Sequence, residues 1–183
     1  MSQIILINGP SSAGKSTLAR ALREALDQPF LHFSFDVFID NEVIPLKKIR
    51  AGGVDWKAMR PQVFDGYHHC LKSLADAGNN LIVDHIIEQK AWLDDLVGLL
   101  SEHDVFFVGV YCSVEELERR ERARGDRRIG EARRDLETVH TFAPYDFELD
   151  AEKPLAENVS ELIDAWIGRS DLSVFNQFVF KPD

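Results

Sequence analysis

Short apolar runs alternate with segments of helical periodicity along most of the chain. The runs that predict β-strands are Gln3–Asn8, Phe30–Phe35, Leu81–Asp84, Val105–Cys112 and, with a weaker pattern, Phe147–Leu149. Their nearly continuous apolar character is typical of strands in a parallel sheet that helices cover on both faces. The alternation therefore predicts an α/β fold built from βαβ units.

Between the predicted strands, apolar residues recur at helical spacing. Two amphipathic stripes are formed by Leu18, Leu22 and Leu26, and by Leu155, Val159, Leu162, Ile163, Trp166 and Ile167. We expect further helices over Val63–Ala77 and Lys90–Ser101, and one opened by a capping box of Ser113 and Glu116. These stripes indicate helices that pack on the sheet, not a cofactor site.

Two segments depart from this pattern. Residues 41–60 contain Pro45, Gly52 and Gly53, so we expect a loop or short helix there, within a substrate-covering segment of about residues 40–62. Residues 170–183 carry phenylalanines without a clear period, and the pattern does not place this tail. Residues 1–169 are predicted to form one domain.

The composition narrows the class of protein. Of 183 residues, 45% are hydrophobic and 28% charged, which is typical of a packed soluble domain. Acidic residues outnumber basic ones by 31 to 21, and the formal charge of -10 opposes binding to nucleic acid or to an anionic membrane surface. With two cysteines and no signal-like or membrane-spanning run, we expect a cytoplasmic protein whose partner is a small molecule. The sequence does not predict an oligomeric state.

The strongest motif is a phosphate-binding loop (P-loop) at Gly9–Ser16, which satisfies G-x-x-x-x-G-K-[ST] between a predicted strand and a predicted helix. In such a loop, backbone N–H groups surround a phosphate, the lysine reaches the terminal phosphates and the serine hydroxyl ligates Mg²⁺. We therefore expect ATP and Mg²⁺ as cofactors. The residues assigned to nucleotide binding are Gly9, Ser11, Ser12, Ala13, Gly14, Lys15, Ser16 and Thr17.

Among P-loop proteins, the chain fits a kinase of small molecules best. It lacks the Asn-Lys-x-Asp motif that reads guanine, and its one D-x-x-G match, Asp95–Gly98, falls within a predicted helix instead of after a strand. Both observations argue against a switch GTPase. A chain of 183 residues is also short for a mechanical ATPase.

Two aspartates follow predicted strands at the sheet edge where ligands bind in α/β folds. We expect Asp36 to orient the acceptor hydroxyl and take its proton, and Lys15 to share in catalysis. The alternative for Asp36 is a cap of a helix that begins near Val37. Asp84 resembles a Walker B aspartate, which with Ser16 holds Mg²⁺, and its alternative is a turn-forming role.

A basic segment lies between residues 115 and 134. Its arginines are Arg119, Arg120, Arg122, Arg124, Arg127, Arg128, Arg133 and Arg134. Glutamates four residues earlier account for the first three as a solvated helix face.

The other arginines flank Gly125 or follow Gly130, which predicts a hinged lid over about residues 124–134 that closes on the triphosphate. The lid arginines assigned to catalysis are Arg127 and Arg133, and those assigned to nucleotide binding are Arg124 and Arg128.

Taken together, these residues show that the chain resembles the chloramphenicol phosphotransferase family of P-loop kinases. The matching segments are Ile4–Leu6 with Asn8–Ser16, Asp36, Ile82–Asp84, Val108–Cys112, Ala123–Arg127, Val139–His140 and Tyr145–Asp146. The resemblance implies a three-layer P-loop kinase fold with a five-stranded parallel sheet and an arginine-rich lid. It also implies use of ATP and Mg²⁺, phosphorylation of an alcohol, and a catalytic aspartate at Asp36.

The acceptor is less defined than the reaction. Apolar residues near Asp36 predict a pocket for a partly apolar alcohol, or else core beneath the covering segment; they are Phe33, Phe35, Phe38, Ile39, Val43 and Trp56. Chloramphenicol-like phosphorylation of a 3-hydroxyl is the leading hypothesis. The alternatives are a kinase of another alcohol, such as a toxin-type kinase of a nucleotide sugar, and a regulatory protein that binds nucleotide without transferring phosphate.

Overall fold

A computed structural model describes residues 1–124, 130–169 and 173–177. Its five strands are β1 (Gln3–Asn8), β2 (Phe30–Ser34), β3 (Asn80–His85), β4 (Asp104–Tyr111) and β5 (Phe147–Asp150). Every neighbouring pair is parallel, in the order β2-β3-β1-β4-β5. The predicted α/β fold and five-stranded parallel sheet are confirmed.

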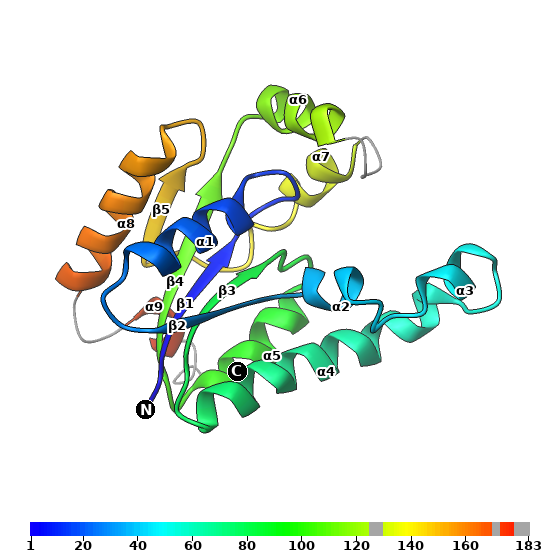
Figure 1. Cartoon of the computed structure of the whole chain (residues 1–183), viewed down its shortest axis with the longest axis horizontal. Helices are drawn as coiled ribbons and strands as arrows, with labels where there is room; N and C mark the ends of the chain where they lie inside the picture. The colour runs from blue at the N-terminus through cyan, green and yellow to red at the C-terminus, as the bar shows by residue number, and fades with distance from the viewer. Residues whose placement is uncertain (125–129, 170–172, 178–183) are drawn as a thin grey trace.

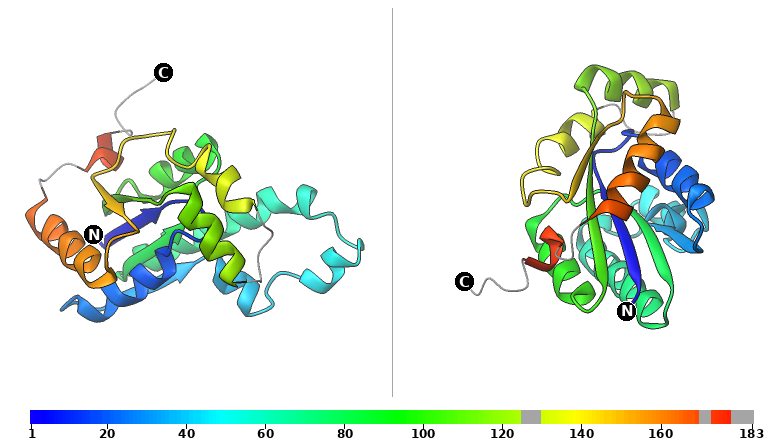
Figure 2. Two further views of the ribbon diagram at one scale, coloured as in Figure 1. Left: turned by 90° about the horizontal axis from the view of Figure 1, so that it is seen from above. Right: turned by 90° about the vertical axis from the view of Figure 1, so that its left-hand side faces the viewer.

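Helices cover both faces of the sheet (Figures 1 and 2). The helices in the described residues are α1 (Lys15–Ala25), α2 (Asp36–Asp40), α3 (Leu46–Arg50), α4 (Trp56–Asp76), α5 (Lys90–Leu100), α6 (Val114–Arg124), α7 (Glu131–Leu136), α8 (Leu155–Gly168) and α9 (Val174–Gln177). Alternate residues of β1 enter different cores: Ile5 and Ile7 pack with α1 and α8, and Ile4 and Leu6 with α4 and α5. None of the described helices is long and apolar enough to cross a bilayer.

The strand register brings the predicted site residues to one edge. Ile7 of β1 pairs with Asp84 of β3, and Ser34 of β2 pairs with the same Asp84. The P-loop leaves β1 one residue after Asn8, and Asp36 follows β2 closely. Since carboxyl ends of parallel strands share an edge, these segments converge there.

Helix α4 begins at Trp56, seven residues before the predicted start at Val63. Asp55 caps it, because its carboxylate accepts hydrogen bonds from the backbone N–H of Lys57, at 2.9 Å, and of Ala58, at 3.4 Å. Pro61 lies inside the helix, where it lacks the N–H that an intrahelical hydrogen bond would use. Residues 41–60 therefore hold the short helix α3 (Leu46–Arg50) and the first turn of α4, which agrees with the short-helix alternative of the prediction.

The predicted capping box at α6 is only half formed. Ser113 Oγ accepts from the backbone N–H of Glu116 at 3.3 Å. The reciprocal bond is absent, because Glu152 accepts from the Ser113 N–H at 2.9 Å and the Glu116 carboxylate is bound by Arg119 and Arg120. Two arginines close to one carboxylate compete better than a neutral amide.

Part of the segment that the sequence pattern did not place packs into the core. Phe175 of α9 is fully buried, and its ring lies 5.7 Å from that of Phe107. Asp146 holds the helix start, since its carboxylate accepts from Ser173 Oγ at 2.5 Å and from the Val174 N–H at 2.7 Å. The segment Ser173–Gln177 thus extends the α4–α5 side of the core.

Candidate active site

The backbone of the P-loop requires glycine at the first and sixth positions of the motif. A Cβ at Gly9 would lie 2.6 Å from the carbonyl oxygen of Val110, so β4 leaves no room for a side chain. Gly14 has a φ of +92° and is the N-cap of α1. Ser12 also adopts a positive φ, +63°, which is strained for a residue with a side chain. This conformation turns the chain from β1 into α1 within one short loop.

Polar side chains of the P-loop are buried at its centre. Lys15 is 7% exposed, and its Nζ donates to the carbonyl oxygen of Pro10 at 2.8 Å. Ser11 Oγ and Ser12 Oγ are buried and have no hydrogen-bond partner among the described residues. Buried hydroxyls without partners cost free energy unless a ligand completes them. Phosphate oxygens held beside the Lys15 ammonium group are suited to accept hydrogen bonds from these two hydroxyls.

The two predicted aspartates stand at neighbouring strand ends. Asp84, 6% exposed, has its Oδ2 2.7 Å from Nε2 of His32 on β2. Asp36 is the first residue of α2 and Phe35 is the N-cap, so the helix-cap alternative is not supported. Burial, and after it the charges of Asp84 and Asp36, raise the pKa of Tyr67 well above its ordinary value.

Two cavities meet at the P-loop. One has a volume of about 570 Å³ and is lined by α6 and the β5–α8 connection; the other, of about 840 Å³, is lined by α2, α3 and α4. Both include Ser12, Gly14 and Thr17. The larger cavity also brings together the predicted catalytic and metal-binding residues Lys15, Ser16, Asp36 and Asp84.

The larger cavity is more polar than the sequence predicted. Of the apolar residues expected to line it, Phe35, Ile39 and Trp56 do so. Phe33 and Phe38 instead pack against Tyr67 at the edge of the core, and Val43 is 61% exposed. The charged residues of the lining are Lys15, Arg20, Asp36, Asp40, Arg50, Arg60, Asp84, Glu88 and Glu131.

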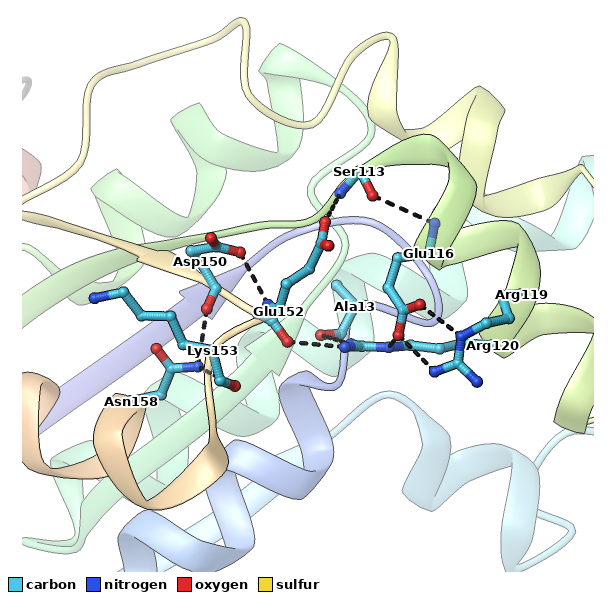
Figure 3. Close-up of polar contacts among 10 residues, drawn as sticks. Ala13, Ser113, Glu116, Arg119, Arg120, Asp150, Glu152, Lys153 and Asn158 are labelled. Carbon is cyan, nitrogen blue, oxygen red and sulfur yellow. Dashed lines mark hydrogen bonds and ion pairs between the residues drawn. The ribbon is translucent and has the colours of Figure 1, made fainter.

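Arg120 holds the P-loop from the side of the smaller cavity (Figure 3). Its guanidinium donates to the carbonyl oxygen of Ala13 at 3.1 Å and to that of Ala151 at 2.8 Å. Its Nε donates to Glu116 at 2.6 Å, and hydrogen bonds from Arg119 and Arg120 lower the pKa of Glu116 to about 2. Sequence periodicity assigned Arg120 to a solvated face because it identified only the contact with Glu116.

Two further supports of the P-loop carry no strong sequence signal. Asp135 of α7 is 8% exposed, and its Oδ2 accepts from the backbone N–H of Ser11 at 3.0 Å. Asn8 donates to the hydroxyl of Tyr145 at 2.8 Å and accepts from the N–H of Ile87 at 2.9 Å. These bonds connect the loop to segments distant in the sequence.

The lid arginines fall partly outside the described residues. Arg127 and Arg128 lie outside the described residues, and Arg124 is the last residue of α6. Arg133 of α7 is paired with Glu118 of α6, with its Nη2 2.7 Å from Oε1. This ion pair joins α6 and α7.

The described residues include no cluster of three or more histidine, cysteine or acidic side chains that could hold a metal ion. A magnesium ion at this edge would therefore depend on the Ser16 hydroxyl, the Asp84 carboxylate and phosphate oxygens. Hard oxygen donors of this kind are the ligands that Mg²⁺ prefers, often through water. The residues present fit Mg²⁺ bound together with a nucleotide.

Comparison with known proteins agrees with this geometry. The "Putative O-phosphotransferase Rv2636" of Mycobacterium tuberculosis is 33% identical over 90% of this chain and 82% of its own length. APS kinase CysC of M. tuberculosis, solved with AMPPNP and APS, matches with a TM-score of 0.68 and 18% identity over 91% of this chain and 98% of its own. A gluconokinase of Sinorhizobium meliloti matches with a TM-score of 0.66 and 20% identity, over 91% of each chain.

These structures show that the fold is that of P-loop kinases, in agreement with the prediction. A family model described as chloramphenicol phosphotransferase-like protein matches residues 2–167. With its P-loop, its strand-end aspartates and this match over most of its length, the chain belongs to the chloramphenicol phosphotransferase-like family.

Proposed function

We propose that the protein is a kinase that transfers the γ-phosphoryl group of ATP, with Mg²⁺, to a hydroxyl of a small molecule. The observation that carries the proposal is the position of Lys15, buried in the P-loop where the two cavities meet. One cavity can take the nucleotide and the other the acceptor. The γ-phosphate would then lie at their junction, which transfer requires.

The smaller cavity suits the nucleoside end of ATP. Val110, Leu149 and Leu155 supply apolar lining, and Arg120 supplies the side chain that joins Ala13 to the opposite wall. A flat base can pack between such groups while the triphosphate follows the P-loop into α1. Arg119 also lines this cavity, and its guanidinium is bound to Glu116.

The larger cavity holds the groups that the reaction needs. Asp36 would accept the proton of the attacking hydroxyl, and Lys15 would neutralise charge on the transferring phosphoryl group. Ser16 and Asp84 would hold Mg²⁺, which when bound screens the charge of the β- and γ-phosphates. The contact of Asp84 Oδ2 with His32 fixes the orientation of the carboxylate at the end of β3.

The lid arginines complete the proposal. Arg127 and Arg133 would neutralise charge on the phosphoryl group, and Arg124 and Arg128 would bind the nucleotide. For Arg133 this requires exchange of its carboxylate partner Glu118 for phosphate, because both ligands use the same guanidinium donors.

A screen of ATP consumption, with product mass determined, tests the proposal. The acceptors are amphenicols, aminoglycosides, nucleosides, sugars and sugar acids, and phosphorylation of a chloramphenicol-like 3-hydroxyl is the first reaction to test. Transfer to another class would keep the kinase and discard the amphenicol. ATP binding without acceptor-dependent consumption by any class would favour the nucleotide-responsive regulatory protein instead.

A further inference from the structure

Arg60 on the second turn of α4 is fixed in the wall of the larger cavity. The central carbon of its guanidinium lies 4.9 Å from the ring centroid of Phe64 and 4.7 Å from that of Trp92. These two rings are themselves stacked, with centroids 4.1 Å apart. Cation–π attraction and contact with two rings hold the group in one place.

Most hydrogen-bond donors of Arg60 are unused. Its Nη2 donates to Oε1 of Glu88 at 2.7 Å, and no other described residue accepts a hydrogen bond from it. A guanidinium carries five N–H donors in a fixed plane, and its side chain here is only 24% exposed. A permanently charged, oriented group with free donors on a cavity wall is suited to bind an oxyanion.

Four of the five acidic residues that line the cavity are engaged or exposed. Asp84 is in contact with His32, Asp36 is assigned to the transfer step, Glu88 is bound to Arg60, and Asp40 is exposed. The fifth, Glu131, is the first residue of α7. Arg60 keeps most of its donors available to a ligand.

We propose that the acceptor is an acidic alcohol, whose carboxylate, sulfate or phosphate group binds Arg60 while its hydroxyl faces Asp36. The inference rests on the proposed function, because that function assigns the larger cavity to the acceptor. Arg60 would thus determine specificity by selecting for a negative charge. Glu88 orients the guanidinium plane through one donor and leaves the others to the ligand.

Calorimetric titration tests the inference without any phosphate transfer. The protein is saturated with a non-hydrolysable ATP analogue and Mg²⁺, and matched alcohols are then titrated into it. Each alcohol is used in an acidic, a neutral and an amino form, for example glucuronate, glucose and glucosamine. The variants are Arg60→Met, which keeps the apolar stem beside the rings, and Arg60→Lys, which keeps the charge. Arg50→Met is the matched control, since Arg50 lines the same cavity but is exposed. Thermal unfolding confirms that each variant is folded.

We expect acids to bind best to the native chain and Arg60→Met to raise their dissociation constant about 100-fold, because it removes two charge-assisted hydrogen bonds. Arg60→Lys should recover part of this loss, and Arg50→Met should change binding less than about threefold. The inference is overturned if no acid binds in an Arg60-dependent manner, or if neutral or amino forms bind as tightly as acids.

Activity measured on the same library separates this inference from the proposed function. Arg60-dependent binding of acids without transfer to any alcohol would uphold the anion site and refute the kinase. Transfer to neutral alcohols that Arg60→Met leaves unchanged would uphold the kinase and overturn the anion site.

Discussion

Replacing Arg120 with methionine should lower the free energy of unfolding by about 3 kcal/mol. Its guanidinium donates to the backbone carbonyls of Ala13 and Ala151, at 3.1 and 2.8 Å. A hydrogen bond from a charged group contributes roughly 1.5–3 kcal/mol. Because the side chain is 26% exposed, water replaces part of each bond, and we take the lower value of about 1.5 kcal/mol for each. The bond to Glu116 adds little, since Glu116 keeps Arg119.

Urea unfolding of Arg120→Met and of its neighbour variant Arg119→Met measures this contribution. Arg119 is 66% exposed and hydrogen-bonds, among the described residues, only with Glu116. Its loss should change the free energy of unfolding by less than about 0.5 kcal/mol. In a chain of this size, 3 kcal/mol corresponds to a fall of about 6–12 °C in Tm. A difference below about 1 kcal/mol between the two variants would refute the structural role assigned to Arg120.

Three further variants test the site, the packing and the pH dependence. Asp36→Asn should lower turnover by about 100-fold or more with ATP affinity unchanged, as loss of a general base does, whereas Asp40→Asn on the same helix should leave turnover unchanged. Steady-state turnover of Asp36→Asn equal to that of the native chain would reject the base role. Gly109→Ala should cost about 1–3 kcal/mol in thermal unfolding, because its Cβ would lie 2.5 Å from the Tyr145 ring, while Gly98→Ala, in open space on α5, should be neutral or stabilising. Burial lowers the pKa of His68 from 6.5 to about 4, so the unfolded chain takes up a proton first and stability falls as the pH drops through that window. His68→Gln should make this fall less steep, and an unchanged slope in urea unfolding would contradict it.

The sheet and the turn from β1 into α1 were predictable because their determinants are local. The continuous apolar runs gave each strand within two residues of its observed ends, and the P-loop motif gave the turn into α1. The positions of Asp36 and Asp84 followed from the rule that ligands bind at the carboxyl ends of parallel strands.

The supports of the site were not predictable because they join distant segments. Helical spacing pairs Arg120 with Glu116, but the bond to Ala13 crosses 107 positions and that of Asp135 to Ser11 crosses 124. The early start of α4 depends on the Asp55 cap and on tertiary packing, which offset the cost of Pro61 inside the helix. The polar character of the larger cavity depends on which aromatic residues turn into the core, which tertiary packing decides.

Transfer of a labelled γ-phosphoryl group from ATP to an acceptor alcohol, measured for the native chain and for Lys15→Ala, tests the central claim most directly. The proposed function predicts acceptor-dependent transfer by the native chain, with formation of the phosphorylated alcohol. It also predicts loss of that product in Lys15→Ala, whose P-loop lacks the buried ammonium group that reaches the terminal phosphates. Transfer that is as fast in Lys15→Ala as in the native chain, or ATP binding by the native chain without transfer to any alcohol, would contradict it.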